Sequence, residues 1–275
     1  MNKKSFNFNF KNKYVTFYKL VLFAEKTKLD SKDCLIQAFN QEALIDNNID
    51  LLKKFIDHFK KIKNSQSQIF QDIFASFIIG DKFDKTFLEF GATNGFDLSN
   101  SYLLENSFGW KGVLSEPSSQ WHEDLKKNRT NSKIITKCIW KVSGKKLDFF
   151  MSDFGELSTL EDFVESDKIS IPSNTEVRLK SGKTISVETI SLNDVVKEYF
   201  NGICPSYISI DTEGSEYEIL KSFDFKNFRP KVFTIEHNYT ENESKIDELL
   251  INNNYSRIFR KLTSFDAWYV CTEIL

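Results

Sequence analysis

The sequence contains few cysteines, and they lie far apart. Its 275 residues include four cysteines, with no C-x-x-C pair among them. They are Cys34, Cys138, Cys204 and Cys271. Disulfide frameworks and zinc sites use cysteines at short, regular spacings, so neither is expected to organise this fold. Scattered single thiols are typical of a reducing compartment, and we expect the protein in the cytoplasm.

The sequence also lacks long apolar runs and a strong charge of either sign. No stretch is long enough to span a membrane, and the first residues show no apolar signal segment. The formal net charge is -2, which provides no positive field for nucleic acid. Hydrophobic residues make up 40% and charged residues 28%, enough for a packed core. We therefore expect a globular protein with no membrane span and no nucleic-acid partner.

The N-terminal part shows a helical pattern. Apolar residues recur at steps of four and three and form one stripe along a helix. The stripe consists of Ile45, Ile49, Leu52, Ile56 and Phe59. We predict that this face packs on the core of the protein. On this basis residues 1–65 are interpreted as an N-terminal helical extension and residues 66–275 as the main domain.

From Thr86 onward, predicted strands and helices alternate. The expected strands are 86–90, 112–115, 133–139, 207–210, 232–236, 255–259 and 268–271. The expected helices are 99–106, 120–128, 192–199, 216–222 and 243–252. Strands that are nearly continuous apolar runs and are separated by helices predict an α/β fold. Its parallel sheet would be covered by helices on both faces.

An insertion interrupts this alternation between residues 141 and 188. Residues 147–151 and 184–190 have the pattern of extra strands, and a polar loop at 155–159 lies between them. Loops at the carboxyl edge of a parallel sheet commonly carry binding residues. We expect the insertion to form a lid or part of an acceptor site.

The first strand is followed by a glycine turn. Glu89, Gly91 and Gly95 have the spacing E-x-G-x-x-x-G, and Asn100 follows at the expected start of a helix. Glycines allow a backbone to approach a ligand closely. A nucleotide-like cofactor at the carboxyl end of a first strand requires such a turn. A turn with a purely structural purpose is the alternative interpretation.

The second strand ends in an acid. Glu116 lies roughly 20–25 residues after the glycines, where dinucleotide sites place a carboxylate for the ribose hydroxyls. Pro117 then ends the strand, because proline cannot donate to the sheet. Two such features on consecutive strand–helix units are less common than either alone. Together they favour a cofactor site.

Acids also follow two later strands. Asp211 and Glu213 come after strand 207–210, and Glu236 and His237 end or follow strand 232–236. Each of these residues by itself is typical of a protein surface or a helix start. Because the carboxyl ends of parallel strands meet at one edge, we expect the group to form a site there.

These motifs together resemble the FkbM family of S-adenosylmethionine-dependent methyltransferases. The resemblance runs from about residue 66 to 269 and depends on Phe87–Gly95, Leu114–Pro117, Ile210–Glu216 and Ile235–Asn238. It implies a Rossmann-like seven-stranded sheet whose final strand is antiparallel. The segments 255–259 and 268–270 would form the last two strands of this sheet.

The resemblance also implies roles for the site residues. Gly91, Gly95 and nearby amides would hold the methionine part of S-adenosylmethionine, with Glu89 organising the turn or the amino group. Glu116 would bind the ribose, and residues 138–140 would border the adenine. The implied cofactor-binding set is Glu89, Gly91, Gly95, Asn100, Glu116, Pro117, Ile139 and Asp211.

Catalysis would depend on the polar residues at the ends of the two later strands. Asp211, Glu236 or His237 would remove the proton from the acceptor, directly or through water. The same three residues could instead hold a magnesium ion that lowers the pKa of a hydroxyl. Paired acids without a metal are the simpler hypothesis.

The expected function is O-methylation of a hydroxyl on a sugar, nucleotide-sugar or glycan, and this acceptor class is implied by the resemblance. Two alternatives remain at this stage. A nicotinamide-dependent oxidoreductase would use the same sheet, but the G-x-G-x-x-G spacing is missing. A non-catalytic nucleotide-binding module would use the N-terminal helices as a partner surface. The oligomeric state is left open, and a homo-oligomer would agree with the sequence.

Overall fold

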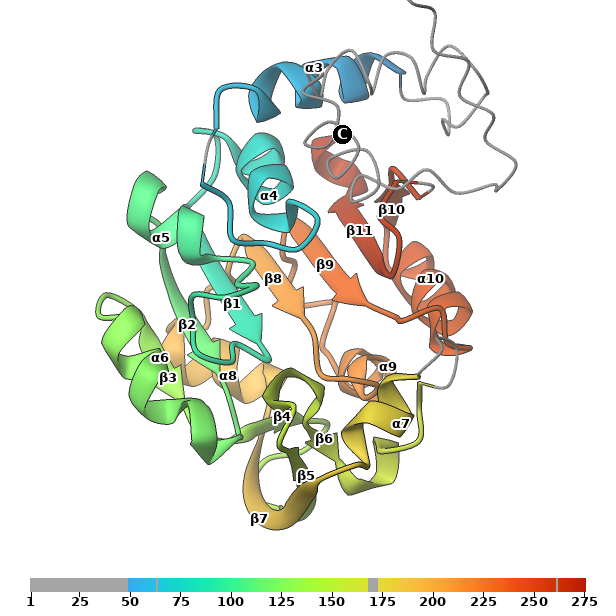
Figure 1. Cartoon of the computed structure of the whole chain (residues 1–275). Helices are drawn as coiled ribbons and strands as arrows, with labels where there is room; N and C mark the ends of the chain where they lie inside the picture. The colour runs from blue at the N-terminus through green and yellow to red at the C-terminus, as the bar shows by residue number, and fades with distance from the viewer. Residues whose placement is uncertain (1–48, 63, 168–172, 261) are drawn as a thin grey trace, which may run out of the picture.

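A computed structural model of the chain describes residues 49–62, 64–167, 173–260 and 262–275 (Figure 1). The predictions that fall on residues 1–48, including Ile45 and Cys34, lie outside the described residues. Among the helices that are described, all are too short or too polar to cross a membrane.

A seven-stranded sheet forms the centre of the fold (Figure 1). Its strand order is β10-β11-β9-β8-β1-β2-β3. The strands are β1 (Thr86–Phe90), β2 (Lys111–Ser115), β3 (Lys133–Ile135), β8 (Tyr207–Ile210), β9 (Val232–Glu236), β10 (Tyr255–Ile258) and β11 (Asp266–Cys271). Strands β3, β2, β1, β8 and β9 are parallel, whereas β11 is antiparallel to β9 and β10. The predicted α/β sheet with its antiparallel final strand is confirmed.

Helices cover both faces of this sheet, because alternate residues of each strand are buried on opposite sides. Leu88 and Phe90 of β1 belong to a core cluster with residues of α8, α9 and α10. Phe87 belongs to the other cluster, with residues of α3, α4, α5 and α6. The helices are α3 (Ile49–Phe59), α4 (Gln71–Ile79), α5 (Tyr102–Phe108), α6 (His122–Asn128), α8 (Leu192–Tyr199), α9 (Glu216–Lys221) and α10 (Asn242–Asn252).

Helix α3 packs directly on the central core. Its residues Leu52, Phe55 and Ile56 are buried. The ring of Phe55 lies edge-on to Phe74 of α4 at 6.0 Å and to Trp268 of β11 at 6.1 Å. The apolar stripe therefore faces the core over the described residues. The division of the chain at residue 65 remains a prediction.

The strand predicted over residues 133–139 is wrong as a single element. Strand β3 ends at Ile135, and a separate strand, β4 (Cys138–Trp140), begins after two residues. The amide of Glu116 donates to the carbonyl of Ile135 at 3.0 Å, and Ser115 Oγ donates to the carbonyl of Lys137 at 3.0 Å. The chain therefore stays beside β2 while it leaves the main sheet.

Strand β4 opens a second sheet that the sequence did not predict as a unit. Its order is β4-β7-β5-β6, with β5 (Lys146–Ser152), β6 (Thr159–Leu160) and β7 (Gly182–Ser191). Strands β5 and β7 contain the two extra strands expected in the insertion. This sheet and the helix α7 (Asn174–Arg178) lie below the carboxyl edge of the main sheet in Figure 1.

The packing of α3 predicts a large stabilising contribution from one ring. We expect Phe55→Ala to lower the free energy of unfolding by about 3–5 kcal/mol, because the substitution leaves a cavity between α3, α4 and β11. Urea denaturation followed by circular dichroism would measure the change. Lys54→Ala, at the neighbouring exposed position, is the control and should change stability little. Equal stability of Phe55→Ala and the parent would show that α3 is not part of the cooperative core.

Candidate active site

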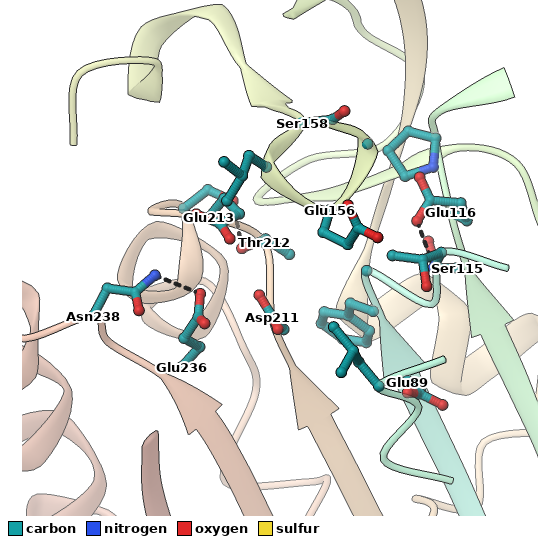
Figure 2. A pocket seen from close by; sticks show the side chains of 18 of the residues that line it. Glu89, Ser115, Glu116, Glu156, Ser158, Asp211, Thr212, Glu213, Glu236 and Asn238 are labelled. Atoms are coloured by element: carbon teal, nitrogen blue, oxygen red, sulfur yellow. Dashed lines mark hydrogen bonds between the residues drawn. The ribbon is translucent and has the colours of Figure 1, made fainter. Parts of the chain in front are cut away.

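A cavity of about 570 Å³ lies where β1, β2, β8 and β9 end (Figure 2). Glu89 and Glu116 border it on the side of β1 and β2, and Asp211 lies between them and Glu236. Glu156, from the insertion, lies across from Asp211. The predicted meeting of strand ends is thus present, and the insertion contributes one wall of the cavity.

Glu89 holds the segment that follows the glycine turn. One carboxylate oxygen accepts the amide of Asn100 at 2.7 Å, and the other accepts the hydroxyls of Ser99 and Ser101. The guanidinium of Arg129 lies 3.7 Å from the carboxylate. The carboxylate is therefore satisfied by the protein, and its visible effect is to fix residues 99–101 along the cavity wall.

Gly91 is required by a close approach of two strand ends. Its φ is +69°, and a Cβ at this position would lie 1.9 Å from the carbonyl oxygen of Asp211. Any larger residue would push the β1 turn away from the β8 turn. Gly91 also lines the cavity, as expected for a residue beside a cofactor.

The expectation for Gly95 needs correction. Its φ is +74°, but the position faces α6, where a Cβ would lie 2.6 Å from Arg129 Cγ and from Leu125 Cδ1. Gly95 does not line the cavity. Its absent side chain makes room for the packing of α6, so it is not in a position to contact a cofactor.

Asn100, at the cavity wall, has an unpaired side-chain oxygen. Its Nδ2 donates to Ser209 Oγ at 3.0 Å, whereas its Oδ1 has no hydrogen-bond partner among the described residues. The residue is buried and lines the cavity. A buried oxygen without a donor is costly. This oxygen therefore fits a ligand that brings a donor, such as the amino group of S-adenosylmethionine.

Glu116 is held by backbone amides at the end of β2. One carboxylate oxygen accepts Thr93 N at 2.9 Å and the other accepts Ser118 N at 2.7 Å. Burial raises the pKa of Glu116 to about 7. Each oxygen accepts one amide and retains capacity for a further donor. This arrangement fits a pair of ribose hydroxyls.

An apolar wall continues beyond Glu116. Pro117, Cys138, Ile139 and Phe149 all line this part of the cavity. Phe149 comes from the second sheet. An apolar surface beside Glu116 fits a purine base. The predicted positions Pro117 and Ile139 therefore lie where a cofactor could contact them.

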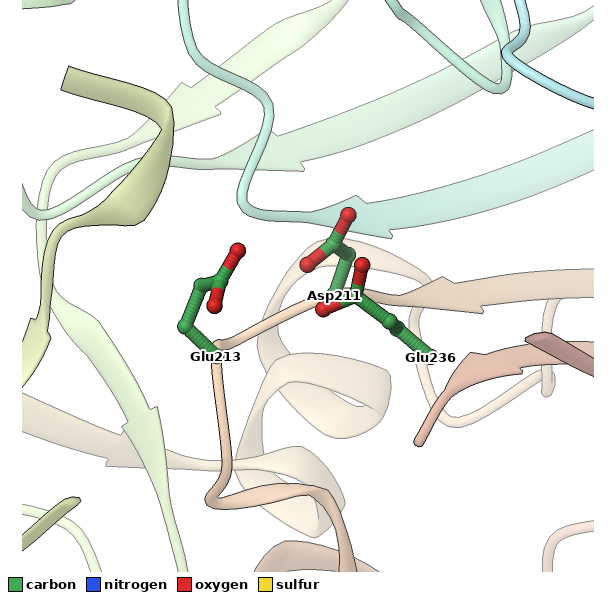
Figure 3. A group of neighbouring side chains, drawn as sticks. All are labelled: Asp211, Glu213 and Glu236. Carbon is green, nitrogen blue, oxygen red and sulfur yellow. The ribbon is translucent and has the colours of Figure 1, made fainter. Parts of the chain in front are cut away.

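Three carboxylates lie together at the ends of β8 and β9: Asp211, Glu213 and Glu236 (Figure 3). One oxygen of each lies within 4.8 Å of the others. Burial raises the pKa of Asp211 to about 7. Burial and then the charge of Asp211 raise the pKa values of Glu213 and Glu236 well above their usual range.

Asp211 and Glu236 form a hydrogen-bonded pair of unequal acidity. The bond between them lowers the pKa of Asp211 and raises the pKa of Glu236. The two carboxyl groups therefore titrate as a coupled pair and not independently. Asn238 Nδ2 also donates to Glu236 Oε2 at 2.8 Å, which fixes the orientation of this carboxyl group (Figure 2).

Glu213 is bound to the insertion by a buried arginine. Arg178 of α7 donates to Glu213 Oε2 at 2.7 Å and to the carbonyl of Val164 at 2.9 Å. Thr159 Oγ1 donates to the carbonyls of Thr212 and Glu213 at 3.1 Å. The insertion is therefore attached to the β8 turn and holds one wall of the cavity in place.

His237 is removed from the candidate site by its position. It does not line the cavity, and it is absent from the group of three carboxylates. Its Nδ1 accepts the amide of Tyr239 at 3.0 Å, and Arg257 Nη2 lies 3.3 Å from its Nε2. Burial lowers the pKa of His237 to about 4. His237 therefore does not lie with Asp211 and Glu236 as expected, and Glu213 is the third side chain of the group.

Sequence reasoning did not select several of the lining residues. Glu213 was noted at the strand end, but its direction into the cavity depends on a positive φ of 58°. Thr93 lies within the glycine motif and supplies the amide that binds Glu116. No sequence signal identified Phe149, Tyr239 or Phe265, because their positions depend on how three segments that are distant in the sequence pack together.

The crowding of carboxylates predicts that Asp211 lowers stability at alkaline pH. The pKa of Asp211 in the folded chain, about 7, lies above its ordinary value of 3.8, so the folded state binds more protons between these values. The stability contributed by protonation is present at low pH and is lost as the pH rises through 7. We expect Asp211→Asn to be more stable than the parent at pH 8, by at least about 1 kcal/mol.

Thermal unfolding at pH 5 and pH 8 would check this prediction. The difference between Asp211→Asn and the parent should shrink at pH 5, where Asp211 is already protonated. Asp148→Asn, at an exposed position of β5, should show no pH-dependent gain. A variant less stable than the parent at pH 8 would contradict the interpretation.

Comparison with known proteins identifies the family of the chain. A family model described as the methyltransferase FkbM domain matches residues 89–266. No curated relative matches the chain. The precorrin-6y C5,15-methyltransferase from Geobacter metallireducens is 11% identical, with a TM-score of 0.37, and the match covers 73% of this chain and 80% of that one.

Two O-methyltransferase structures are similarly distant. The enzyme from Bacillus cereus, in complex with SAH, is 11% identical, with a TM-score of 0.39 and coverage of 86% of this chain and 95% of that one. TomG from Streptomyces achromogenes, in complex with SAM, is 9% identical, with a TM-score of 0.37 and coverage of 86% and 96%. The family model matches more than half of the chain, and the chain therefore belongs to the FkbM family of S-adenosylmethionine-dependent methyltransferases.

Proposed function

We propose that this methyltransferase transfers a methyl group to a hydroxyl of a sugar, nucleotide-sugar or glycan, with Asp211 as the base. The observation that supports this best is a carboxylate of raised pKa in the same cavity as the cofactor-binding turn. Family membership favours this function over the two alternatives, the nicotinamide-dependent oxidoreductase and the non-catalytic module.

The residues proposed to hold the cofactor lie in order along the sheet edge. Asn100 Oδ1 and the turn at Gly91 would bind the methionine part, and Glu116 would bind the ribose. Pro117 and Ile139 would border the adenine. When bound, S-adenosylmethionine supplies an electrophilic methyl group, which forms a bond to the acceptor oxygen as its bond to sulfur breaks.

The protein's own task is then to position the acceptor and to take its proton. Asp211 lies between the cofactor turn on β1 and the acids at the end of β9 (Figure 2). A pKa of about 7 lets it accept a proton at neutral pH while part of the population stays ionised. Glu236 is hydrogen-bonded to Asp211 and holds it in place.

A base without a metal is the version we favour. Glu213, the third carboxylate, is already paired with the guanidinium of Arg178 at 2.7 Å. Glu236 is hydrogen-bonded by Asn238 and shares a proton with Asp211. A divalent ion would have to compete with this cation and with this proton. Magnesium bound by Asp211, Glu213 and Glu236 is the alternative.

We place the protein in a reducing compartment, the cytoplasm. Cys138, Cys204 and Cys271 are all free thiols, and Cys138 and Cys271 are buried. Burial raises the pKa values of Cys138 and Cys204 to about 12, which keeps both thiols unreactive. Free thiols of this kind are typical of a protein in a reducing compartment.

The ribose assignment predicts a specific loss of affinity. We expect Glu116→Ala to weaken binding of S-adenosylhomocysteine tenfold or more, because hydrogen bonds to a charged group contribute about 1.5–3 kcal/mol. Calorimetric titration would measure it, with Glu123→Ala at an exposed position as the control. Unchanged affinity in Glu116→Ala would remove the ribose assignment. No binding by the parent chain would contradict the proposed use of the cofactor.

The base assignment predicts the pH dependence of turnover. Turnover should rise with pH up to about 7 and then level off, because Asp211 must be ionised to accept a proton. We expect Asp211→Asn to lose about 10²–10⁴-fold in kcat with cofactor affinity retained. Glu236→Gln, which keeps a donor, should lose much less.

Initial rates of S-adenosylhomocysteine formation, with and without a chelator, would test this assignment. A large loss in Glu236→Gln together with a mild loss in Asp211→Asn would transfer the role of base to Glu236. A rate that disappears with the chelator and returns with magnesium would favour the metal alternative.

A further inference from the structure

The charged side chains that line the described part of the cavity are all acids. They run from Glu116 at the end of β2 to Glu236 at the end of β9, with Glu156 on the insertion. No lysine, arginine or histidine is among the described lining residues. The two buried arginines, Arg129 and Arg178, are engaged with Glu89 and Glu213 and do not line the cavity.

This charge pattern decides which acceptors can enter. A phosphate or carboxylate next to the reacting hydroxyl would lie among carboxylates in a partly desolvated space, without a counterion from the described lining residues. Like charges juxtaposed in this way are a strong means of rejecting a wrong partner. A neutral hydroxylated ring meets no such penalty, and an amino group would be attracted.

A tyrosine ring is held at the opening of the same cavity. Tyr239 lines the cavity, yet half of its surface is exposed. Its hydroxyl is hydrogen-bonded to Ser264 Oγ at 2.6 Å, and its amide donates to His237 Nδ1 at 3.0 Å. The rings of Tyr239 and His237 meet edge to face at 5.6 Å. The ring is therefore fixed in position although it is open to solvent.

The backbone that presents this ring is strained. Asn238 and Tyr239 both have positive φ values, 44° and 56°. Left-handed conformations of residues other than glycine are costly and persist where the surrounding structure imposes them, often at ligand sites. His237 supports this turn, because its Nδ1 accepts the amide of Tyr239 and its ring packs against the tyrosine ring.

The cavity that contains this ring also has apolar and uncharged polar groups in its wall. Leu98, which is 45% exposed, and Phe265 line the same cavity, as do the amides Gln68 and Asn174. An aromatic face is electronegative and attracts the C–H groups of a saturated ring, while amides and carboxylates bind hydroxyls. This combination suits a ring with one apolar face and several hydroxyls.

We propose that the acceptor is a hydroxylated saturated ring that rests on Tyr239 and carries no phosphate or carboxylate close to the reacting hydroxyl. The inference rests on the proposed O-methylation and narrows its acceptor. Neutral and amino-bearing rings are accepted, and uronic acids and ring phosphates are rejected. A nucleotide-linked sugar is accepted only if its diphosphate stays outside the cavity.

Ligand-observed NMR on the full chain loaded with S-adenosylhomocysteine tests this inference. Four probes of one ring size serve: methyl glucoside, glucosamine, glucuronic acid and glucose 6-phosphate. We expect saturation transfer to the neutral and amino probes and at least tenfold weaker binding of the two anions. Binding of an anion as strong as that of methyl glucoside, or no binding of either methyl glucoside or glucosamine, would overturn the proposal.

Three variants test which side chains of the cavity determine the binding of these probes. Tyr239→Ala should weaken the neutral and amino probes at least tenfold, whereas Tyr239→Phe, which loses only the bond to Ser264, should retain most of the binding. Glu156→Lys, at an exposed lining position, should improve binding of glucuronic acid. Equal binding by Tyr239→Ala and the parent would contradict the ring position.

Calorimetry with S-adenosylhomocysteine distinguishes a failure of the acceptor inference from a failure of the proposed methyltransferase function. If the chain binds S-adenosylhomocysteine but the probes fail, the acceptor inference is wrong and the methyltransferase function stands. If S-adenosylhomocysteine does not bind, the proposed function fails, and the probes are then measured on the unloaded chain. Because the Tyr239 surface is formed by the protein alone, absence of probe binding there would overturn the inference independently.

Discussion

Burial of carboxylates at one edge of the sheet is the constraint on which this structure depends. Two arginines with no exposed surface, Arg129 and Arg178, compensate part of that burial. Arg129 contacts Glu89 and Glu105, and Arg178 contacts Glu213. A buried carboxylate without a partner costs several kcal/mol, so these pairs determine which loops can pack where. Arg129 holds the glycine turn after β1, and Arg178 holds the insertion.

Asp211 and Glu236 are two acids of this edge that neither arginine contacts. Their pKa values are raised because burial disfavours charge, and they respond by sharing a proton. The lack of a cation among the described residues that line the cavity supports both proposals made above. It gives Asp211 a pKa suited to proton transfer near neutrality, and it makes the cavity unfavourable for anions. The same electrostatic arrangement thus affects both the proposed proton transfer to Asp211 and the proposed selection of the acceptor.

The fold was largely predictable because its signals are local. Strands β1, β8 and β9 begin and end where the apolar runs predicted, and α8 does so as well. The stretch 133–139 failed because a continuous apolar run does not reveal where a strand leaves one sheet for another. The second sheet depends on pairings between β4 and β7, about fifty residues apart in the sequence. Such long-range contacts leave little trace in a local pattern.

The sequence by itself determined which residue types gather at the sheet edge, because parallel strands bring their carboxyl ends to one side. This placed Glu89, Gly91, Glu116, Asp211 and Glu236 correctly at the cavity. Only the tertiary structure decided which neighbouring side chains turn into it. Gly95 packs against α6, and His237 lies against Arg257. Glu213 and Tyr239 instead line the cavity, and both have a left-handed backbone conformation. Direction at a strand end depends on a single φ angle and on what packs behind it, and neither is encoded in spacing.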